Sequence, residues 1–341
     1  MNKKIHLITG ITGMVGSHLL DYLYENTSDT IIGICRWRSP LNNVKKYLNE
    51  ANDESRIIFD FADLNDITSL MRVINNFKPD FIYHLAAQSY PQTSFTAPID
   101  TLQTNIIGTL NLLESIRLSG DSNYNPKIHV CSSSEVFGRV PKDRVPIVED
   151  ELFHPASPYA ISKAGTDLLG RYYGEAFNMK TVVTRMFTHT GPRRGDVFAE
   201  SSFAKQIALI EAGISEPVIK VGNLDSLRTF ADVRDAVRAY YILINKDYSN
   251  GDYFNIGGSY TCKVGEMLNT LISLSPLKSK IKVEVEDKRL RPIDADLQIP
   301  NLKKFKDLTG WEPKISFENT MKDLLNYWRE EIKNKENHLV R

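Results

Sequence analysis

The sequence predicts an α/β fold in which a doubly wound parallel sheet is joined to a smaller, discontinuous C-terminal α/β lobe. Three observations predict this class. Short apolar runs alternate with amphipathic stretches of helical length over the first half of the chain. A glycine-rich turn joins the first apolar run to the first amphipathic stretch. A serine-rich segment closes a later apolar run and is followed by a helix that opens with a tyrosine and a lysine four residues apart.

Composition excludes several classes of protein. The 341 residues are 42% hydrophobic and 25% charged, which is enough apolar material for a sizeable core. The 42 basic and 42 acidic residues give a net charge of zero, so we expect neither nucleic acid nor a membrane as a partner. Cys35, Cys131 and Cys262 lie far apart, which predicts reduced thiols and no metal site. With no apolar run of transmembrane or signal-peptide length, we expect a cytoplasmic protein.

The first predicted strand, residues 5–8, is followed by a G-x-x-G-x-x-G pattern that opens a helix. Gly10 permits the tight turn, Gly13 lets the backbone approach a diphosphate, and Gly16 lets helix and strand pack closely. The helix N-terminus then offers free N–H groups to phosphate. This context predicts a Rossmann-type dinucleotide site. The contact residues predicted here are Gly10, Gly13, Met14, Val15 and Gly16.

The second predicted strand, residues 30–35, ends where the adenine ribose is expected. An acidic residue at that place would bind the 2′-hydroxyl of NAD, but this chain offers Arg36 and Arg38. Guanidinium groups suit a 2′-phosphate, so we expect NADP(H) in preference to NAD.

Two further strands, residues 56–61 and 80–85, complete the expected cofactor site. Asp63 and Leu64 follow the first, where a carboxylate either meets the adenine or caps the next helix. Leu85, Ala86 and Ala87 close the second, and the small alanines let the chain pass close to the cofactor. A loop beginning at Ser89 is expected to touch substrate.

Residues 101–118 have helical apolar spacing, and Asn105 lies among them. Its amide is expected either to orient the active-site lysine or a water, or to lie on the helix face without a chemical role.

The segments C-S-S-S-E-V-F-G and S-P-Y-A-I-S-K hold the candidate catalytic residues. Ser133, Ser134 and Glu135 follow a predicted strand, and Tyr159 and Lys163 share one face of the helix that Ser-Pro introduces. An ammonium one turn from a phenol eases its ionisation, which suits the phenol to proton transfer from a hydroxyl. Glu135 is a candidate second base.

In their order and spacing, T-G-I-T-G-M-V-G, D-L, H-L-A-A-Q-S, S-S-S-E-V-F-G and Y-A-I-S-K resemble the extended short-chain dehydrogenase/reductase family. The second half narrows the resemblance. The segments at 186–195, 203–207, 221–235 and 290–292 are similar to those of the GDP-mannose 4,6-dehydratases, and equally to those of their sister GDP-4-keto-6-deoxy-mannose reductases.

The resemblance implies a lyase that uses NADP internally on a GDP-hexose. Tyr159, assisted by Lys163, would remove the proton of the 4′-hydroxyl while Ser133 binds O4′. Glu135 would take the C5′ proton before water leaves C6′. Ser133 replaces the usual threonine but also occurs in the reductases, so it favours neither. The loops at 94–98 and 192–195 favour the dehydratase, with a reductase, a 4-epimerase or a non-enzymatic cofactor-binding protein as alternatives.

The resemblance also implies substrate contacts in the second half. Arg228 and Arg291 are expected at the nucleotide diphosphate or ribose, and Lys205 at the base or a phosphate. Thr188 stands where the family often has asparagine, which leaves the sugar open. The substrate residues predicted in this way are Ser89, Ser134, Thr188, Arg193, Lys205, Arg228 and Arg291.

The predicted domains are interleaved along the chain. Residues 1–187 and 229–257 would form the dinucleotide-binding domain, and residues 188–228 and 258–341 the sugar-nucleotide lobe. In this family the helices near 101–118 and 158–177 form the dimer face, and Leu168, Tyr172 and Tyr173 would supply apolar area. We therefore expect a homodimer or homotetramer.

Overall fold

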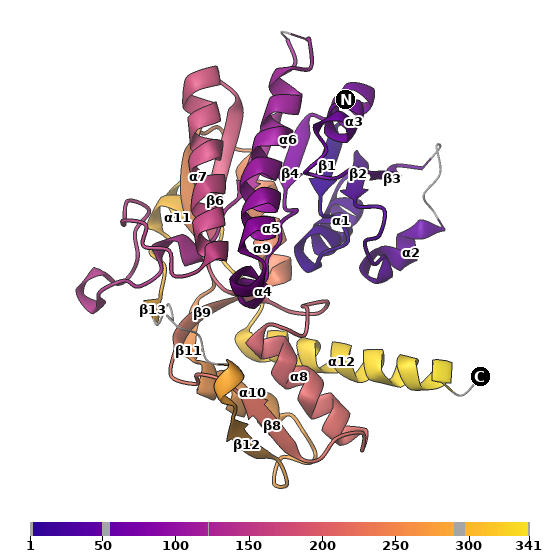
Figure 1. Cartoon of the computed structure of the whole chain (residues 1–341), viewed down its shortest axis with the longest axis vertical. Coiled ribbons are helices and arrows are strands. Elements are labelled where there is room, and N and C mark those ends of the chain that lie inside the picture. The colour runs from indigo at the N-terminus through magenta and orange to yellow at the C-terminus, as the bar shows by residue number, and fades with distance from the viewer. Residues whose placement is uncertain (1–2, 50–54, 122, 290–296, 340–341) are drawn as a thin grey trace.

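The computed structural model describes residues 3–49, 55–121, 123–289 and 297–339. They form a larger lobe around a central sheet and a smaller lobe, which lies below it in Figure 1.

The central sheet has seven parallel strands in the order β10-β6-β5-β4-β1-β2-β3. The strands are β1 Ile5–Thr9, β2 Thr30–Cys35, β3 Ile57–Phe61, β4 Phe81–His84, β5 Lys127–Cys131, β6 Lys180–Met186 and β10 Asp252–Ile256. The winding reverses between β1 and β4, and ligands of such sheets bind at the carboxyl ends of the strands beside that reversal. The predicted doubly wound parallel sheet is confirmed.

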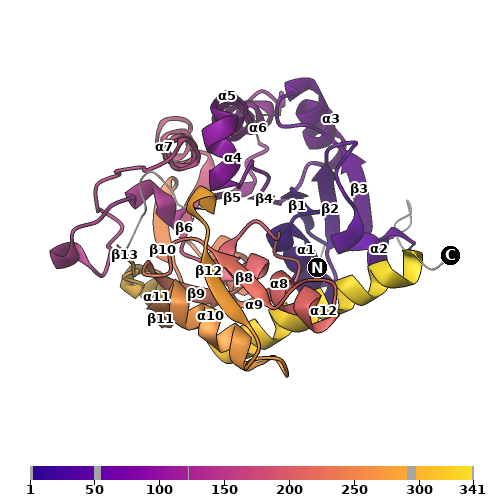
Figure 2. The ribbon, with the colours of Figure 1, turned by 60° about the horizontal axis from the view of Figure 1, so that its bottom comes forward.

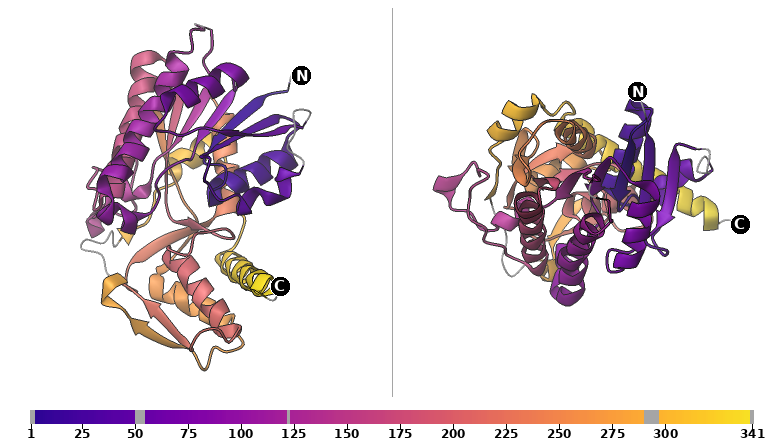
Figure 3. Two further views of the ribbon diagram at one scale, coloured as in Figure 1. Left: turned by 45° about the vertical axis from the view of Figure 1, so that its right-hand side comes forward. Right: turned by 90° about the horizontal axis from the view of Figure 1, so that it is seen from above.

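Helices cover both faces of this sheet (Figure 3). Helices α1 (Met14–Asn26) and α9 (Val233–Ile244) pack on one face; α3 (Ile67–Phe77), α6 (Gly108–Arg117) and α7 (Pro158–Phe177) pack on the other. Consecutive residues of β1 show this, because Leu7 lies in the core under α3 and α6 while Ile8 lies in the core under α1 and α9. Strands buried on both faces explain the continuous apolar runs in the sequence.

The smaller lobe is built around strand β9 (Leu227–Asp232), which pairs with three short strands. These are β7 His189–Thr190, β11 Tyr260–Lys263 and β13 Leu297–Gln298. A separate parallel pair joins β8 (Val218–Val221) to β12 (Lys282–Val285). Helices α8 (Ala199–Glu211), α10 (Val264–Ser273) and α12 (Phe317–Leu339) enclose the lobe's own apolar core, and α12 crosses the base of the molecule in Figure 2.

Strand β9 runs directly into helix α9, and Asp232 stands at the junction. Its carboxylate accepts hydrogen bonds from the backbone N–H of Arg234 at 2.8 Å and from the hydroxyl of Thr320 on α12, also at 2.8 Å. A single residue therefore caps the helix that packs on the cofactor sheet and ties it to the smaller lobe.

The predicted helix over 101–118 is divided in the structure. Helix α5 (Pro98–Leu102) leads into a π-helical turn over Gln103–Ile107 and then into α6. The carbonyl of Asn105 in this turn accepts the hydroxyls of Thr109 at 2.6 Å and Thr166 at 3.0 Å. Its side chain donates to the carbonyl of Gln88 at 2.9 Å and to the hydroxyl of Ser162 at 2.8 Å. Asn105 therefore has a structural role, holding the end of the β4 loop to α7.

Helix α7 begins at a capped turn, as its Ser-Pro sequence predicts. The hydroxyl of Ser157 accepts from the N–H of Ala160 at 3.0 Å, and Pro158 occupies the first turn. Leu168 and Tyr172 are exposed on this helix, but Tyr173 is buried and donates a hydrogen bond to Glu114 on α6. The expectation that Tyr173 adds to an exposed face is therefore wrong. The remaining short helices are α2 Lys45–Leu48, α4 Pro91–Thr96 and α11 Lys303–Thr309.

Candidate active site

One cleft, with a cavity volume of about 920 Å³, lies between the two lobes. Its walls come from the carboxyl ends of β1, β2, β4 and β5 and, opposite them, from the segments around β7, α8 and β9. All the predicted cofactor residues line it: Gly10, Gly13, Met14, Val15, Gly16, Arg36, Asp63, Leu64, Leu85, Ala86, Ala87, Tyr159 and Lys163.

The glycine turn fits a dinucleotide. Gly10 has a φ of +69°, and a Cβ there would lie 2.8 Å from Cα of Ala86. A Cβ on Gly16 would lie 2.3 Å from the carbonyl oxygen of Gly10. Helix α1 then begins after Gly13 without a side-chain cap or an acidic residue in its first turn. Its N-terminal N–H groups thus remain available for phosphate.

Just after the carboxyl end of β2, Arg36 is exposed and lines the wall of the cleft together with Ser39 and Asn43. Asp63 accepts a hydrogen bond from the N–H of Asn65 at 2.9 Å, whereas Asp66 caps helix α3. Asp63 is therefore not the helix cap, and its contact with the adenine stays a prediction.

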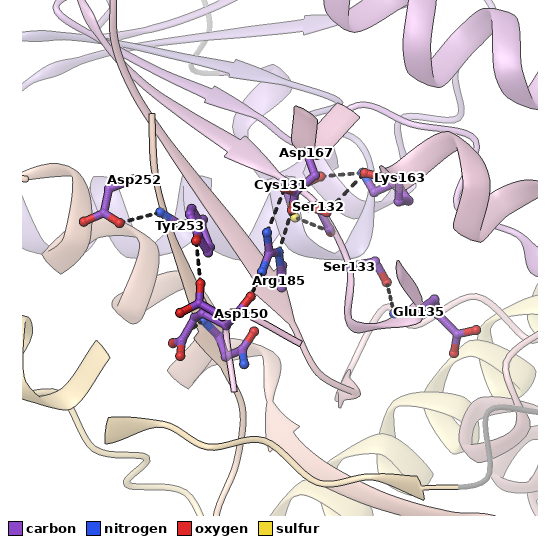
Figure 4. A network of polar contacts seen from close by, with 12 residues as sticks. Cys131, Ser132, Ser133, Glu135, Asp150, Lys163, Asp167, Arg185, Asp252 and Tyr253 are labelled. Carbon is purple, nitrogen blue, oxygen red and sulfur yellow. Dashed lines mark hydrogen bonds and ion pairs between the residues drawn. The ribbon is translucent and has the colours of Figure 1, made fainter. Parts of the chain in front are cut away.

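The predicted catalytic residues meet at the carboxyl end of β5, and Figure 4 shows Ser133, Glu135 and Lys163 among them. The hydroxyl of Ser133 accepts from the N–H of Glu135 at 3.2 Å. The phenol of Tyr159 is hydrogen-bonded to the Ser133 side chain. One turn along α7, the ammonium of Lys163 donates to the main-chain carbonyl of Cys131. All four predicted catalytic side chains line the same cleft.

Charge and burial act on these groups in opposite directions. Desolvation raises the pKa of Tyr159 above its ordinary value, while its hydrogen bond with Ser133 and the positive charge of Arg194 lower it. Desolvation lowers the pKa of Lys163, and the negative charge of Asp167 raises it. In this structure the ammonium of Lys163 donates to the main-chain carbonyl of Cys131 and not to the phenol of Tyr159.

The predicted substrate residues divide into two groups. Ser89, Ser134, Thr188, Arg193 and Arg228 line the cleft. Arg291 lies outside the described residues.

Lys205 lies on α8 away from the residues that line the cleft. Its ammonium pairs with Asp196 at 2.5 Å and lies 5.3 Å from the centre of the Trp328 ring. Spacing alone predicts which turn of a helix a residue occupies, but not which way that helix faces.

Several cleft residues were not predicted as site residues, among them Arg194 and Glu200. The Arg194 guanidinium pairs with Glu200 at 3.1 Å and stacks on the ring of Phe198 at 3.4 Å. Tyr90 packs edge-on against Phe198, with 5.5 Å between the ring centroids. His189 also lines the cleft. The P-R-R-G sequence predicts a basic loop, but not that Arg193 pairs with Asp21 and Arg194 with Glu200.

In the described part of the chain, no group of three or more His, Cys, Asp or Glu side chains has an arrangement that could hold a metal ion. None of its helices combines the length and apolar character needed to cross a membrane.

A family model described as GDP-mannose 4,6 dehydratase matches residues 7–324. Among curated proteins, GDP-mannose 4,6 dehydratase 1 of Arabidopsis thaliana is 31% identical over 329 residues, covering 95% of this chain and 89% of the relative. GDP-6-deoxy-D-mannose reductase of Pseudomonas aeruginosa is 30% identical over 332 residues, covering 96% and 97%.

Solved structures share the fold over nearly the whole chain. The structure of RMD from Pseudomonas aeruginosa complexed with NADPH has a TM-score of 0.76 at 27% identity, covering 96% of this chain and 100% of that one. UDP-glucose 4-epimerase from Thermotoga maritima, with UDP-glucose, has a TM-score of 0.81 at 26% identity, covering 96% and 99%.

Proposed function

This chain belongs to the GDP-mannose 4,6-dehydratase family, and from that premise we propose that it is an NADP(H)-dependent sugar-nucleotide 4,6-dehydratase. Its substrate would be a GDP-hexose resembling GDP-mannose, and its product the 4-keto-6-deoxy sugar nucleotide. The observation that carries the proposal is the meeting of Ser133, Glu135, Tyr159 and Lys163 in one cleft with the glycine turn.

NADP(H) is the proposed cofactor because Arg36 stands at the end of β2, where a 2′-phosphate would lie. When bound, it would supply the acceptor and later the donor of one hydride. The α1 N-terminus would hold its diphosphate, and the Ala86–Ala87 turn would lie against it.

Tyr159 and Glu135 have different proton-transfer tasks in the proposed reaction. Tyr159 would accept the proton of the sugar 4′-hydroxyl, with Ser133 holding O4′. The 4′-ketone so formed acidifies the C5′ proton, which Glu135 would remove. Glu135 would then return that proton to the departing hydroxyl at C6′, which leaves as water. Addition of the stored hydride at C6′ and of one proton at C5′, matching the proton given up by the 4′-hydroxyl, would complete the 4-keto-6-deoxy product.

Electrostatics support a nucleotide diphosphate on the lobe side of the cleft. Arg228, from β9, would bind the phosphates, and Thr188 and Ser134 would contact the sugar. We retain Arg193, Ser89, Lys205 and Arg291 as proposed substrate residues, with Lys205 reaching a ligand only after leaving Asp196.

A second candidate function is NADPH-dependent reduction of a GDP-4-keto-6-deoxy sugar. A 30% identical relative over 96% of the chain is named as such a reductase, and the same Ser133, Tyr159 and Lys163 would deliver the proton to O4′. A sugar-nucleotide 4-epimerase is the remaining alternative in this fold.

We further propose the domain division given by the sequence, with residues 1–187 and 229–257 holding the cofactor and residues 188–228 and 258–341 holding the sugar nucleotide. Leu168 and Tyr172 on α7, 53% and 55% exposed, would contribute to the face of a homodimer or homotetramer. The proposed location is the cytoplasm.

The deciding experiment is incubation of the purified protein with GDP-mannose and catalytic NADP⁺, followed by mass spectrometry. The dehydratase would give a product lighter by one water without net NADPH. Stoichiometric oxidation of NADPH by the 4-keto-6-deoxy sugar nucleotide would instead establish the reductase, and an isomer of unchanged mass the epimerase. The Tyr159→Phe variant controls for contaminating activity.

A further inference from the structure

The carboxylate of Asp21, on α1, contacts two segments that are far apart in the sequence. Its Oδ1 accepts a hydrogen bond from the phenol of Tyr47 at 2.8 Å and pairs with the ammonium of Lys46 at 2.9 Å. Its Oδ2 pairs with the guanidinium of Arg193 at 2.8 Å. The Asp21 side chain is 16% exposed. A single, largely buried carboxylate therefore holds helix α2 with one oxygen and the loop after β7 with the other.

The first segment, residues 36–48, runs from the end of β2 through α2 and forms the wall of the cleft at the proposed 2′-phosphate site. Arg36 and Asn43 line the cleft there. The Asn43 side chain donates to the carbonyl of Thr12 in the glycine turn at 2.9 Å. Tyr47 is 3% exposed, so the hydroxyl that it offers to α1 moves only when the segment moves.

The second segment is the loop that leads from β7 to α8. Arg193 lines the cleft in this loop and has a left-handed backbone, with a φ of +67°. Such a conformation is unfavourable for a residue with a side chain and persists where surrounding contacts hold it. The contacts here come from α1, because Asp21 pairs with the guanidinium and His18 Nε2 donates to the carbonyl of Pro192 at 3.0 Å. The position of Arg193 therefore depends on α1.

We propose that Asp21 is a positioning residue that couples the two halves of the cleft, so that binding of NADP⁺ places Arg193 for the sugar nucleotide. This inference rests on the proposed function, in which Arg36 binds the 2′-phosphate and Arg193 contacts the substrate. His18 contacts the loop and Asn43 contacts the glycine turn, whereas Asp21 contacts both segments. Asp21 is not among the residues that line the cleft, so it would act through Arg193.

The coupling arises because one side chain has to satisfy both segments. When the 2′-phosphate fixes residues 36–48, Tyr47 holds the Asp21 carboxylate in the rotamer that also receives Arg193. The sugar nucleotide then has less conformational freedom to remove and binds more tightly. By linkage, the sugar nucleotide tightens NADP⁺ binding by the same factor. NAD⁺ lacks the 2′-phosphate, so its effect on the sugar nucleotide should be weaker.

The test is calorimetric titration of GDP into the protein alone, with saturating NAD⁺ and with saturating NADP⁺. We expect NADP⁺ to lower the Kd of GDP by about fivefold or more, and NAD⁺ to lower it less. The variant Lys46→Met/Tyr47→Phe removes both α2 contacts of Asp21 and leaves its pair with Arg193. In this variant NADP⁺ should lower the Kd no more than NAD⁺ does, with the Kd of GDP in the free protein nearly unchanged. A merely structural anchor on Arg193 would not respond to this change.

The double variant Lys78→Met/Tyr124→Phe is the matched control. The Lys78 ammonium lies 4.9 Å from the centre of the Tyr124 ring, as the Lys46 ammonium lies 4.7 Å from that of Tyr47. The Tyr124 phenol also donates a hydrogen bond, but this tyrosine packs against the core under α3 and α6, on the other face of the sheet from α1. The control should keep the wild-type response. Equal effects of NADP⁺ and NAD⁺ in the wild type, or an undiminished effect of NADP⁺ in Lys46→Met/Tyr47→Phe, would overturn the proposal.

Amide hydrogen exchange gives a second measurement, which needs no substrate. In the wild type, NADP⁺ should slow exchange in peptides that contain residues 191–195 more than NAD⁺ does. In Lys46→Met/Tyr47→Phe the two dinucleotides should act alike. If the protein binds no GDP but shows this protection, the proposed substrate is wrong and the coupling stands. GDP binding with neither the protection nor the change in Kd would overturn the coupling and leave the proposed substrate in place.

Discussion

Asp167 and Arg185 form a buried, doubly hydrogen-bonded ion pair one helical turn from Lys163, the proposed catalytic lysine (Figure 4). The Arg185 Nε lies 2.7 Å and its Nη2 2.9 Å from the two carboxylate oxygens of Asp167. The pair joins α7 to β6, and its carboxylate lies one turn from Lys163. The stability of the fold and the pKa of Lys163 therefore both depend on the carboxylate of Asp167.

Asp167→Asn should destabilise the protein, because it leaves the Arg185 guanidinium buried without a counter-charge. We expect a loss of about 3–5 kcal/mol in the free energy of unfolding, measured by urea denaturation. The surface pair Lys303–Asp307 gives a control, since its side chains are 78% and 61% exposed and Asp307→Asn should have little effect. Equal stability of the two variants would contradict this account.

Glu135→Gln should stop the loss of water while nucleotide binding persists. The amide cannot accept the C5′ proton, so formation of the 4-keto-6-deoxy product should fall by about 10²–10⁴-fold. Calorimetry of GDP binding checks that the cleft is intact. Full turnover in this variant would remove Glu135 from its proposed role.

Arg36→Met should weaken NADP⁺ binding and leave NAD⁺ binding nearly unchanged, because only NADP⁺ offers a 2′-phosphate to the guanidinium. One lost charge-assisted hydrogen bond corresponds to an increase in Kd of about tenfold to a hundredfold. Fluorescence titration with both nucleotides measures it. Arg38→Met is the matched control, since Arg36 is the one of the two predicted arginines that lines the cleft.

Gly16→Ala should disrupt the cofactor turn, because the new methyl would lie 2.3 Å from the carbonyl oxygen of Gly10. We expect a lower thermal midpoint and loss of dinucleotide binding. Gly265→Ala is the matched helical control, because its Cβ would meet its nearest atom at 3.4 Å. That change should stabilise α10 by up to about 1 kcal/mol. Normal cofactor affinity in Gly16→Ala would show that the turn can widen.

Buried histidines should make the fold sensitive to mild acid. Burial lowers the pKa of His84 to about 3 and that of His18 to about 4, from an ordinary value of 6.5. The unfolded chain therefore binds these protons first, and stability should fall as pH drops below 6.5 toward 4. The expected slope is about 1.4 kcal/mol per pH unit for each such histidine. Urea midpoints measured between pH 7 and 5 test it, and His18→Gln should make the fall shallower.

Sequence patterns predicted the cofactor half well because its signals are local. The strand before Gly10 and the helix after it are neighbours in the chain, so periodicity and glycine placement determine their arrangement. Tyr159 and Lys163 share a helix for the same reason. The meeting of Ser133 with Tyr159 required the resemblance as well, since many residues separate them.

The remaining site features depend on contacts that spacing does not encode. Arg193 and Arg194 are adjacent and both line the cleft, but Arg193 pairs with Asp21 on α1 and Arg194 pairs with Glu200 on α8. Lys205 has a suitable charge but lies on a part of α8 that pairs with Asp196. The π turn at Asn105 arises from hydroxyls on two different helices.

The junction of β9 with α9 has a consequence for how the two lobes can move. Arg228 lies on the strand whose last residue, Asp232, caps a helix packed on the cofactor sheet and is tied to α12. Because no flexible linker separates them, a hinge at this point would have to break the hydrogen bonds that the Asp232 carboxylate accepts from the N–H of Arg234 and from the hydroxyl of Thr320. We expect the spacing between Arg228 and the glycine turn to stay nearly constant when ligands bind. A fixed distance would make the cleft select its substrate by length. A nucleotide diphosphate sugar would extend from Arg228 to the residues near the glycine turn, whereas a free sugar phosphate would be too short to contact both.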